Sequence, residues 1–256
     1  MKVLTVGDIV GRTGLQKLKE VLPKIIKDNE IDFVIVNGEN AADGMGLTEK
    51  MYKEILALNV NVVTMGNHTW WKKEIFNFID DKHILRPANY SKTNPGRGYD
   101  IYECKGKKIG VINLIGRTSM SVLSENPFTV AKEIVSEIKN KVDLIVIDFH
   151  AEATAEKIAL GYFLDGEITI LFGTHTHVQT ADETILEKGT AYITDIGMTG
   201  PSKSVIGMDI GASIKRFETS LPEKYKIAEG KAKFNSCVFE IDDKTNKVIK
   251  ITRINK

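Results

Sequence analysis

Short apolar runs rich in valine and isoleucine recur along the chain, and helical segments lie between many of them. Several runs are apolar on both faces, which is typical of strands buried on both sides of a sheet. The seven clearest runs are residues 2–6, 32–37, 61–65, 108–114, 143–149, 168–172 and 191–194. Strands that alternate with helices predict an α/β core with right-handed crossover connections.

The periodicity of apolar residues places the helices. One is predicted over residues 13–29, with one apolar face and Pro23 as a point where it could kink. A second is predicted to begin at Thr48, whose side chain suits an N-cap. The remaining predicted helices cover residues 70–80, 128–140 and 154–164. Residues 233–254 instead indicate two strands joined by a polar turn.

Length and composition fit one domain over residues 1–256, because the chain can bury a large core and shows neither a repeat nor a linker. The formal net charge of +1 indicates no extended nucleic-acid surface. The spacing of Cys104 and Cys237 suggests no disulfide framework. The first residues lack a signal-peptide pattern, and no apolar run reaches membrane-spanning length. We therefore expect a cytoplasmic protein without a membrane partner.

Five of the predicted strands end in polar side chains of the kinds that bind metals. In chain order these ends are Gly7-Asp8, Gly38-Glu39-Asn40, Gly66-Asn67-His68, His150 and Gly173-Thr174-His175-Thr176-His177. Ligands of open α/β sheets bind at the carboxyl ends of strands, and glycine lets the backbone turn sharply there. These side chains are therefore predicted to share one site.

The positions of the histidines strengthen this prediction. Four of the five histidines lie at these strand ends, whereas His83 lies in a polar-rich run. A single histidine is more often a hydrogen-bonded structural residue than a ligand. Asp8, Asn40 or Asn67 alone could equally be a turn or cap residue. Their shared position at strand ends favours a common site over these separate explanations.

The donor set indicates the kind of site. Imidazole, carboxylate and amide oxygen together suit borderline or hard divalent metals such as iron, manganese or zinc, and they do not form a soft thiolate site. Seven candidate ligands exceed what one tetrahedral ion needs, but they suit two ions roughly 3.5–4 Å apart that share a carboxylate. Such a pair activates water and holds a phosphoryl oxygen. His68 follows Asn67 directly and is predicted to project toward the substrate.

The order of these motifs resembles that of the calcineurin-like metallophosphoesterase superfamily, and in detail its YmdB-like bacterial phosphodiesterase branch. The matching segments are GDIVGRTG, NGENAADGMGLT, GNHTWW, RPANY, FHAEATAEK, GTHTHVQTAD and DIGMTGP. The resemblance implies a four-layer α/β/β/α sandwich. It also implies a phosphodiesterase acting on small phosphodiesters, notably 2′,3′-cyclic nucleotides.

The resemblance further implies a role for each candidate residue. One metal would be held by Asp8, Glu39, Asn40 and His177. The other would be held by Glu39, Asn67, His150 and His175, with Glu39 bridging the two ions. A hydroxide shared by the metals would attack phosphorus. His68 would donate a proton to the leaving ribose oxygen, because an alkoxide departs poorly without one.

The chain departs from the wider superfamily at four positions. Val10 stands where the first motif usually has histidine, and Glu39 replaces the bridging aspartate. Asn40 takes the place of the missing histidine ligand, and Thr69 stands where a carboxylate usually follows the GNH motif. These departures match the YmdB-like branch. They leave the two divalent or trivalent ions open among iron, which we favour, and manganese, zinc or magnesium.

Other residues carry weaker signals. Arg12 could contact phosphate beside a helix N-terminus, although a solvated loop arginine is an equal alternative. Trp70 and Trp71 could stack on a base, but helix packing is the more probable use of at least one. Gly197–Pro201 reads as a turn beside the site.

Two alternative functions remain open. The same metal pair could serve a phosphomonoesterase, a phosphoprotein phosphatase or an RNA-end phosphatase. The chain could instead be a regulatory protein whose metal site senses a nucleotide. A homo-oligomer is expected only because small α/β enzymes often assemble.

Overall fold

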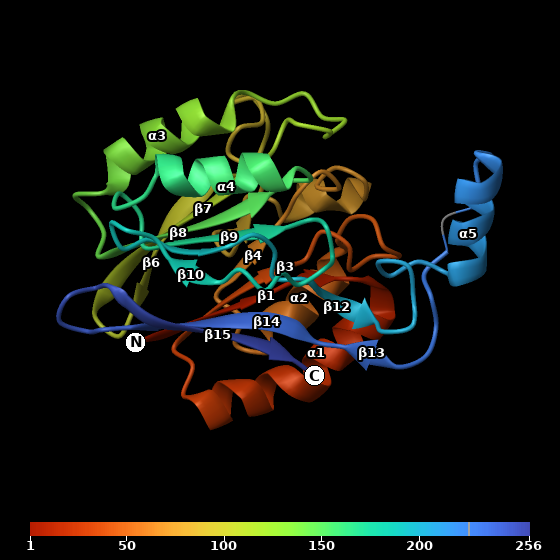
Figure 1. Cartoon of the computed structure of the whole chain (residues 1–256), viewed down its shortest axis with the longest axis horizontal. Coiled ribbons are helices and arrows are strands. Elements are labelled where there is room, and N and C mark those ends of the chain that lie inside the picture. Colours follow the sequence, from red (N-terminus) through yellow and green to blue (C-terminus); the bar gives the residue numbers. More distant parts are fainter. Residues whose placement is uncertain (225) are drawn as a thin grey trace.

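The computed structural model describes residues 1–224 and 226–256. Two six-stranded sheets lie face to face, with helices on their outer faces (Figure 1). The four layers run helix, sheet, sheet, helix, which confirms the predicted α/β/β/α sandwich.

The first sheet has the strand order β15-β14-β1-β3-β4-β5. Four strands run parallel: β1 (Lys2–Val6), β3 (Phe33–Asn37), β4 (Val62–Thr64) and β5 (Ile84–Leu85). The antiparallel strands are β14 (Asn235–Ile241) and β15 (Val248–Asn255), which confirms the predicted C-terminal strand pair. The outer face is covered by α1 (Gly11–Asn29), α2 (Glu49–Leu56) and the 3-10 helix η1 (Lys73–Asn77).

The second sheet has the strand order β10-β11-β9-β8-β7-β6. Its parallel strands are β7 (Lys107–Ile115), β8 (Leu144–His150), β9 (Ile170–Thr174) and β11 (Ala191–Ile193). The edges are β6 (Tyr99–Cys104) and β10 (Thr184–Ile185), each antiparallel to its neighbour. Helices α3 (Pro127–Ile138) and α4 (Thr154–Phe163) cover its outer face.

A continuous apolar layer fills the space between the two sheets. Phe33 and Ile35 of the first sheet belong to the same buried cluster as Val146, Ile170 and Phe172 of the second. Strand residues therefore alternate between this central layer and the helical layers. This alternation explains why so many strands are apolar on both faces.

The predicted helices differ from the structure in two places. Helix α1 begins at Gly11 and continues through Pro23. Buried leucines and isoleucines on both sides of the proline pack on the first sheet, and this packing outweighs the lost hydrogen bond. The helix predicted at 70–80 is reduced to η1, because Trp70 stacks on Phe76 with ring centroids 5.5 Å apart and joins the core beside α2.

Several other elements were also not predicted from the sequence, including β5, β6 and β10, and two more of them are informative. Residues Met198–Pro201 form strand β12 rather than a turn, because β12 pairs in parallel with β2 (Asp8–Ile9) and antiparallel with β13 (Ala232–Lys233). Helix α5 (Ile210–Thr219), all of whose residues are described, has no buried residue and projects from the body (Figure 1). Its apolar residues Ile210, Ile214 and Phe217 recur at helical spacing and were overlooked in the sequence.

Across the described helices, the structure shows none with the length and apolar character that a bilayer crossing requires.

The layer between the sheets should dominate stability. Phe172→Ala should lower the free energy of unfolding by about 3–5 kcal/mol, because it opens a cavity in a fully packed layer. Phe217→Ala is the matched control, since the Phe217 side chain on α5 is 79% exposed. Urea denaturation of the two variants measures the difference. Equal losses would contradict the assignment of the central layer as the principal core.

Candidate active site

The candidate ligands meet where the carboxyl ends of the parallel strands of the two sheets lie beside each other. The first sheet supplies the oxygen donors, which are Asp8 after β1, Glu39 and Asn40 after β3, and Asn67 after β4. The second sheet supplies the imidazoles, which are His150 at the end of β8 and His175 and His177 after β9. The structure thus brings together side chains from five strand ends.

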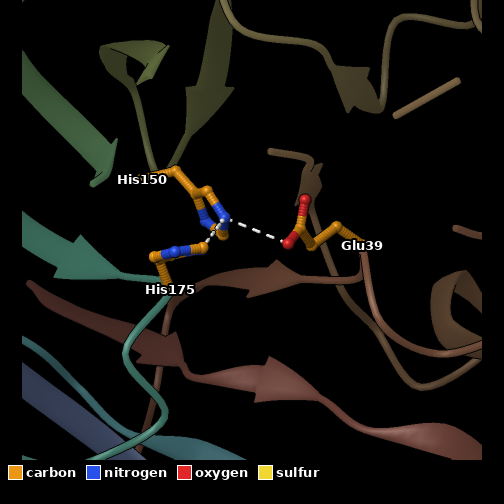
Figure 2. Close-up of side chains that lie close together, drawn as sticks. All are labelled: Glu39, His150 and His175. Atoms are coloured by element: carbon orange, nitrogen blue, oxygen red, sulfur yellow. Dashed lines mark hydrogen bonds and ion pairs between the residues drawn. The ribbon is translucent and has the colours of Figure 1, made fainter. Parts of the chain in front are cut away.

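One group of these side chains centres on His150. Figure 2 shows Glu39, His150 and His175 pointing toward one another, and their ligand atoms lie within 4.8 Å of one another. His150 Nε2 lies 3.0 Å from Glu39 Oε1 and 3.0 Å from His175 Nδ1. Asn67 Oδ1 lies 3.0 Å from the same nitrogen. A carboxylate, two imidazoles and an amide oxygen therefore converge as a cation site requires.

The second group contains Asp8, Asn40 and His177. His177 Nε2 lies 3.9 Å from Asp8 Oδ1. Asp8 Oδ1 and Asn40 Oδ1 are both buried, and among the described residues neither has a hydrogen-bond donor. A buried acceptor without a partner costs free energy, and a bound cation is a partner that would satisfy such an oxygen. The residues present therefore fit a metal in this half of the site as well.

The charges in the site favour a cation at its centre. Burial alone would raise the pKa of Glu39, but His150 and His68 hold it well below its usual range. Burial alone would lower the pKa of His150, but Glu39 and Asp8 raise it to about 9. Burial and the neighbouring His150 lower the pKa of His175 to about 3. A neutral His175 imidazole is the form that can bind a metal.

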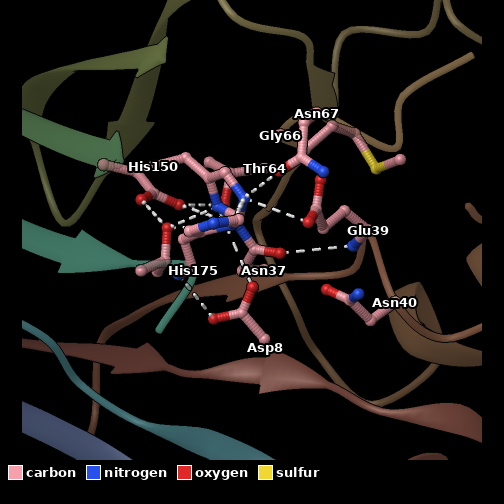
Figure 3. A network of polar contacts seen from close by, with 12 residues as sticks. Asp8, Asn37, Glu39, Asn40, Thr64, Gly66, Asn67, His150 and His175 are labelled. Atoms are coloured by element: carbon pink, nitrogen blue, oxygen red, sulfur yellow. Dashed lines mark hydrogen bonds and ion pairs between the residues drawn. The ribbon is translucent and has the colours of Figure 1, made fainter. Parts of the chain in front are cut away.

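A buried polar network behind the site fixes the ring of His150 (Figure 3). Thr174 donates its hydroxyl proton to Asp148 Oδ1 at 2.7 Å, and its oxygen lies 2.9 Å from His150 Nδ1. Thr174 must therefore accept from His150 Nδ1, which leaves Nε2 to face the ligand group. Asn37 and Thr64 donate to the other oxygen of Asp148. Such outer partners orient metal-binding histidines in other proteins.

A buried ion pair holds the loop that carries the other two histidines. Lys157 Nζ lies 2.7 Å from Asp195 Oδ2 and donates to the carbonyl of Thr174 at 2.8 Å. Asp195 accepts from both the backbone and the hydroxyl of Thr176. His175 and His177, on either side of Thr176, have positive φ angles of 96° and 63°. The ion pair therefore stabilises a backbone that these residues rarely adopt.

The predicted proton donor lies at the edge of this group. His68 Nδ1 lies 3.3 Å from Glu39 Oε1 and 3.2 Å from Asn40 Nδ2, and the ring is partly exposed. The edge of Trp71 meets the His68 ring, with centroids 5.6 Å apart, and Trp71 is 59% exposed. Trp70 is used for packing, as predicted for at least one tryptophan.

Two residues lie apart from the ligand group. Arg12 lines a cavity of about 470 Å³ together with Lys19, Asp43 and Glu54, and none of the seven ligand candidates lines it. A phosphate role for Arg12 stays a prediction. His83 Nδ1 donates a hydrogen bond to the carbonyl of Asn61 at 2.8 Å, as expected for a structural histidine.

Sequence reasoning missed most of the supporting residues. Asp148 carried a signal, because it is the one charged residue inside the apolar run 144–149. Thr174 lies within the GTHTH motif but was not given a role. Lys157 and Asp195 could be found only from the fold, since a buried pair separated by 38 residues leaves no local pattern.

Comparison with known proteins identifies the family of the chain. Residues 4–254 match the family described as YmdB-like protein. The chain belongs to the YmdB-like family. It is 51% identical to the Bacillus subtilis protein named 2′,3′-cyclic-nucleotide 2′-phosphodiesterase, over 99% of this chain and 96% of that protein.

Solved structures place this YmdB-like chain in the same fold. A crystal structure described as a novel phosphatase from Mycoplasma pneumoniae is 39% identical, covers 100% of this chain and 93% of its own, and has a TM-score of 0.95. A 5′-nucleotidase precursor from Thermus thermophilus is 12% identical, with a TM-score of 0.59 over 100% of this chain and 54% of its own. At that identity the second match shows the fold alone.

The glycine of the GNH motif should be indispensable for metal binding. A Cβ atom at Gly66 would lie 2.3–2.5 Å from His150 Cδ2, His150 Nε2 and Glu39 Oε2, so Gly66→Ala must displace ligand atoms. We expect the variant to lose bound manganese, measured by elemental analysis after reconstitution. Gly211→Ala is the control, because the nearest atom to a Cβ there is 3.4 Å away. Full metal content in Gly66→Ala would contradict the site geometry.

Proposed function

We propose that this YmdB-like protein is a metal-dependent phosphodiesterase that hydrolyses small phosphodiesters, foremost 2′,3′-cyclic nucleotides. The observation that carries the proposal is the convergence of four oxygen-donor residues and three imidazoles at one edge of two sheets. The name of the Bacillus subtilis relative, which is 51% identical over nearly the whole chain, supports the same reaction and substrate class.

The proposal assigns the seven ligands to two ions. Asp8, Asn40 and His177 would hold one, while Asn67, His150 and His175 would hold the other, with Glu39 shared. Iron is our first choice, and manganese, zinc and magnesium are alternatives with similar donor preferences. When bound, the ions would activate water for attack on phosphorus and polarise its oxygens.

His68 is proposed as the proton donor to the leaving oxygen. His68 Nδ1 lies 3.3 Å from the carboxylate oxygen Oε1 of Glu39 and 3.2 Å from Asn40 Nδ2. Glu39 can accept a proton from His68 Nδ1, and the proton that His68 would give to the leaving group is then the one on Nε2. The neighbouring backbone N–H of His68 donates to Glu39 Oε2 at 2.9 Å, which keeps the ring beside the proposed metals.

Trp71 is proposed to meet the base of a nucleotide substrate. Its exposed ring touches His68 at the edge of the site, and an aromatic face can stack on any base. This contact would affect substrate binding and leave the chemistry at phosphorus unchanged.

A substrate panel tests the proposed activity. Protein reconstituted with manganese should hydrolyse 2′,3′-cyclic nucleotides faster than the corresponding 2′- and 3′-monophosphates, because the relative that is 51% identical is named for the cyclic substrate. Product analysis by chromatography measures both rates. Faster turnover of monoesters would support a phosphomonoesterase, and no turnover of either class would contradict the enzymatic proposal.

The role of His68 can be separated from metal binding. His68→Ala should keep both ions, yet lose roughly 10²–10⁴-fold in rate on a cyclic nucleotide, the usual scale for general-acid catalysis. The loss should shrink on a nitrophenyl diester, because a nitrophenolate leaves without protonation. Asn67→Ala is the paired variant, since loss of a ligand should lower metal content and slow both substrates.

The outcome that contradicts this role is equally clear. If His68→Ala loses metal, or if the two substrates slow by the same factor, His68 binds or positions phosphate and is not the proton donor.

A further inference from the structure

The three ligand histidines each have one ring nitrogen that faces the site and one that faces away. For His150 the outward nitrogen is Nδ1, which lies 2.9 Å from Thr174 Oγ1. For His177 it is also Nδ1, which donates to the carbonyl of Ile206 at 2.8 Å. Both partners accept the proton and leave Nε2 for the site. The orientation of these two rings is therefore set by the hydrogen bond that each Nδ1 makes.

His175 has the opposite orientation. Its Nδ1 faces the site, 3.0 Å from His150 Nε2, so its outward nitrogen is Nε2. That nitrogen lies 3.1 Å from Glu152 Oε2. A carboxylate has no proton to give at neutral pH, and it therefore favours a proton on His175 Nε2 and a free lone pair on Nδ1. Glu152 therefore contacts the outward nitrogen of His175 as Thr174 contacts that of His150 and Ile206 contacts that of His177.

Glu152 differs from those two partners in charge and exposure. Its side chain is 51% exposed, and it directly follows the short segment that leaves β8 at His150. His175 also has an unusual φ of 96°, so its backbone needs outside contacts to hold the ring in place. A carboxylate behind a metal-binding imidazole orients the ring and makes it a stronger ligand.

We propose that Glu152 is a positioning residue for the metal centre, which sets the tautomer and orientation of His175 through its Nε2 atom. This role rests on the proposed function, because it requires that His175 bind a metal through Nδ1. It adds a third carboxylate to a site whose proposed ligands include only two, Asp8 and Glu39. The added negative charge also offsets the charge of two neighbouring cations.

Metal binding to the full chain after chelation tests this role without an activity assay. Titration with Co²⁺, followed by calorimetry and by its visible absorption, should show two sites in the wild type. Glu152→Ala should weaken one of them about 10–100-fold, the usual effect of removing such a partner. The Co²⁺ affinity of Glu152→Gln should lie between those of the wild type and Glu152→Ala, because the glutamine amide oxygen still accepts a hydrogen bond but carries no charge.

A matched control removes the same charge nearby. Glu156 lies four residues after Glu152, and its carboxylate accepts hydrogen bonds from the backbone N–H groups of Arg117 and Thr118 instead of facing a histidine. Glu156→Gln removes its charge. This variant should bind both ions as the wild type does. Equal weakening in Glu152→Gln and Glu156→Gln would show a general charge effect and overturn the positioning role.

A second measurement reports the tautomer directly. Imidazole ¹⁵N NMR of the metal-free protein should show His175 protonated on Nε2, and Glu152→Ala should increase the Nδ1-protonated fraction. If the wild type binds Co²⁺ at two sites, and Glu152→Ala changes neither the Co²⁺ affinity nor the His175 tautomer, the role of Glu152 alone is overturned. A wild type that binds no metal would overturn the proposed centre and this role together.

Discussion

The structure depends on the face-to-face packing of two sheets through one apolar layer. Each sheet contains four adjacent parallel strands, and the buried residues that join the sheets also set the positions of the strand ends. The site lies at the border of this layer, where apolar side chains give way to polar ones within one or two residues. Because interiors pack as densely as crystals, small shifts between the sheets would separate the ligand atoms.

The chemistry of the site divides along the same border. The first sheet gives the oxygen donors and the second gives the imidazoles, so each proposed ion takes ligands from both sheets. Behind the imidazoles, Asp148 and Asp195 act through threonine residues, and Lys157 compensates one of these buried charges. A buried ion pair is costly, so its retention behind the histidine loop fits a role in fixing geometry.

Much of the fold could be predicted because the signals were local. The valine-rich runs, the N-cap at Thr48 and the polar residues after each strand all depend on a few neighbouring positions. What could not be predicted depends on contacts between distant segments. β12 forms a strand only because β2 lies beside it, whereas α5 was overlooked although its apolar residues recur at helical spacing. Glu152 follows His150 in sequence, yet its partner is His175, which only the fold reveals.

Because the two sheets supply different donors, the candidate oxygen ligands are synthesised before the candidate imidazole ligands. All four oxygen ligands lie within the first 67 residues, whereas the imidazoles lie at positions 150, 175 and 177. A nascent chain could fold β1, β3 and β4 and still present only carboxylates and amides, which suit hard and weakly held ions. The nitrogen donors that favour transition metals arrive after β8 and β9 have joined. If these residues hold the proposed ions, a transition metal would be preferred only once β8 and β9 have joined the sandwich.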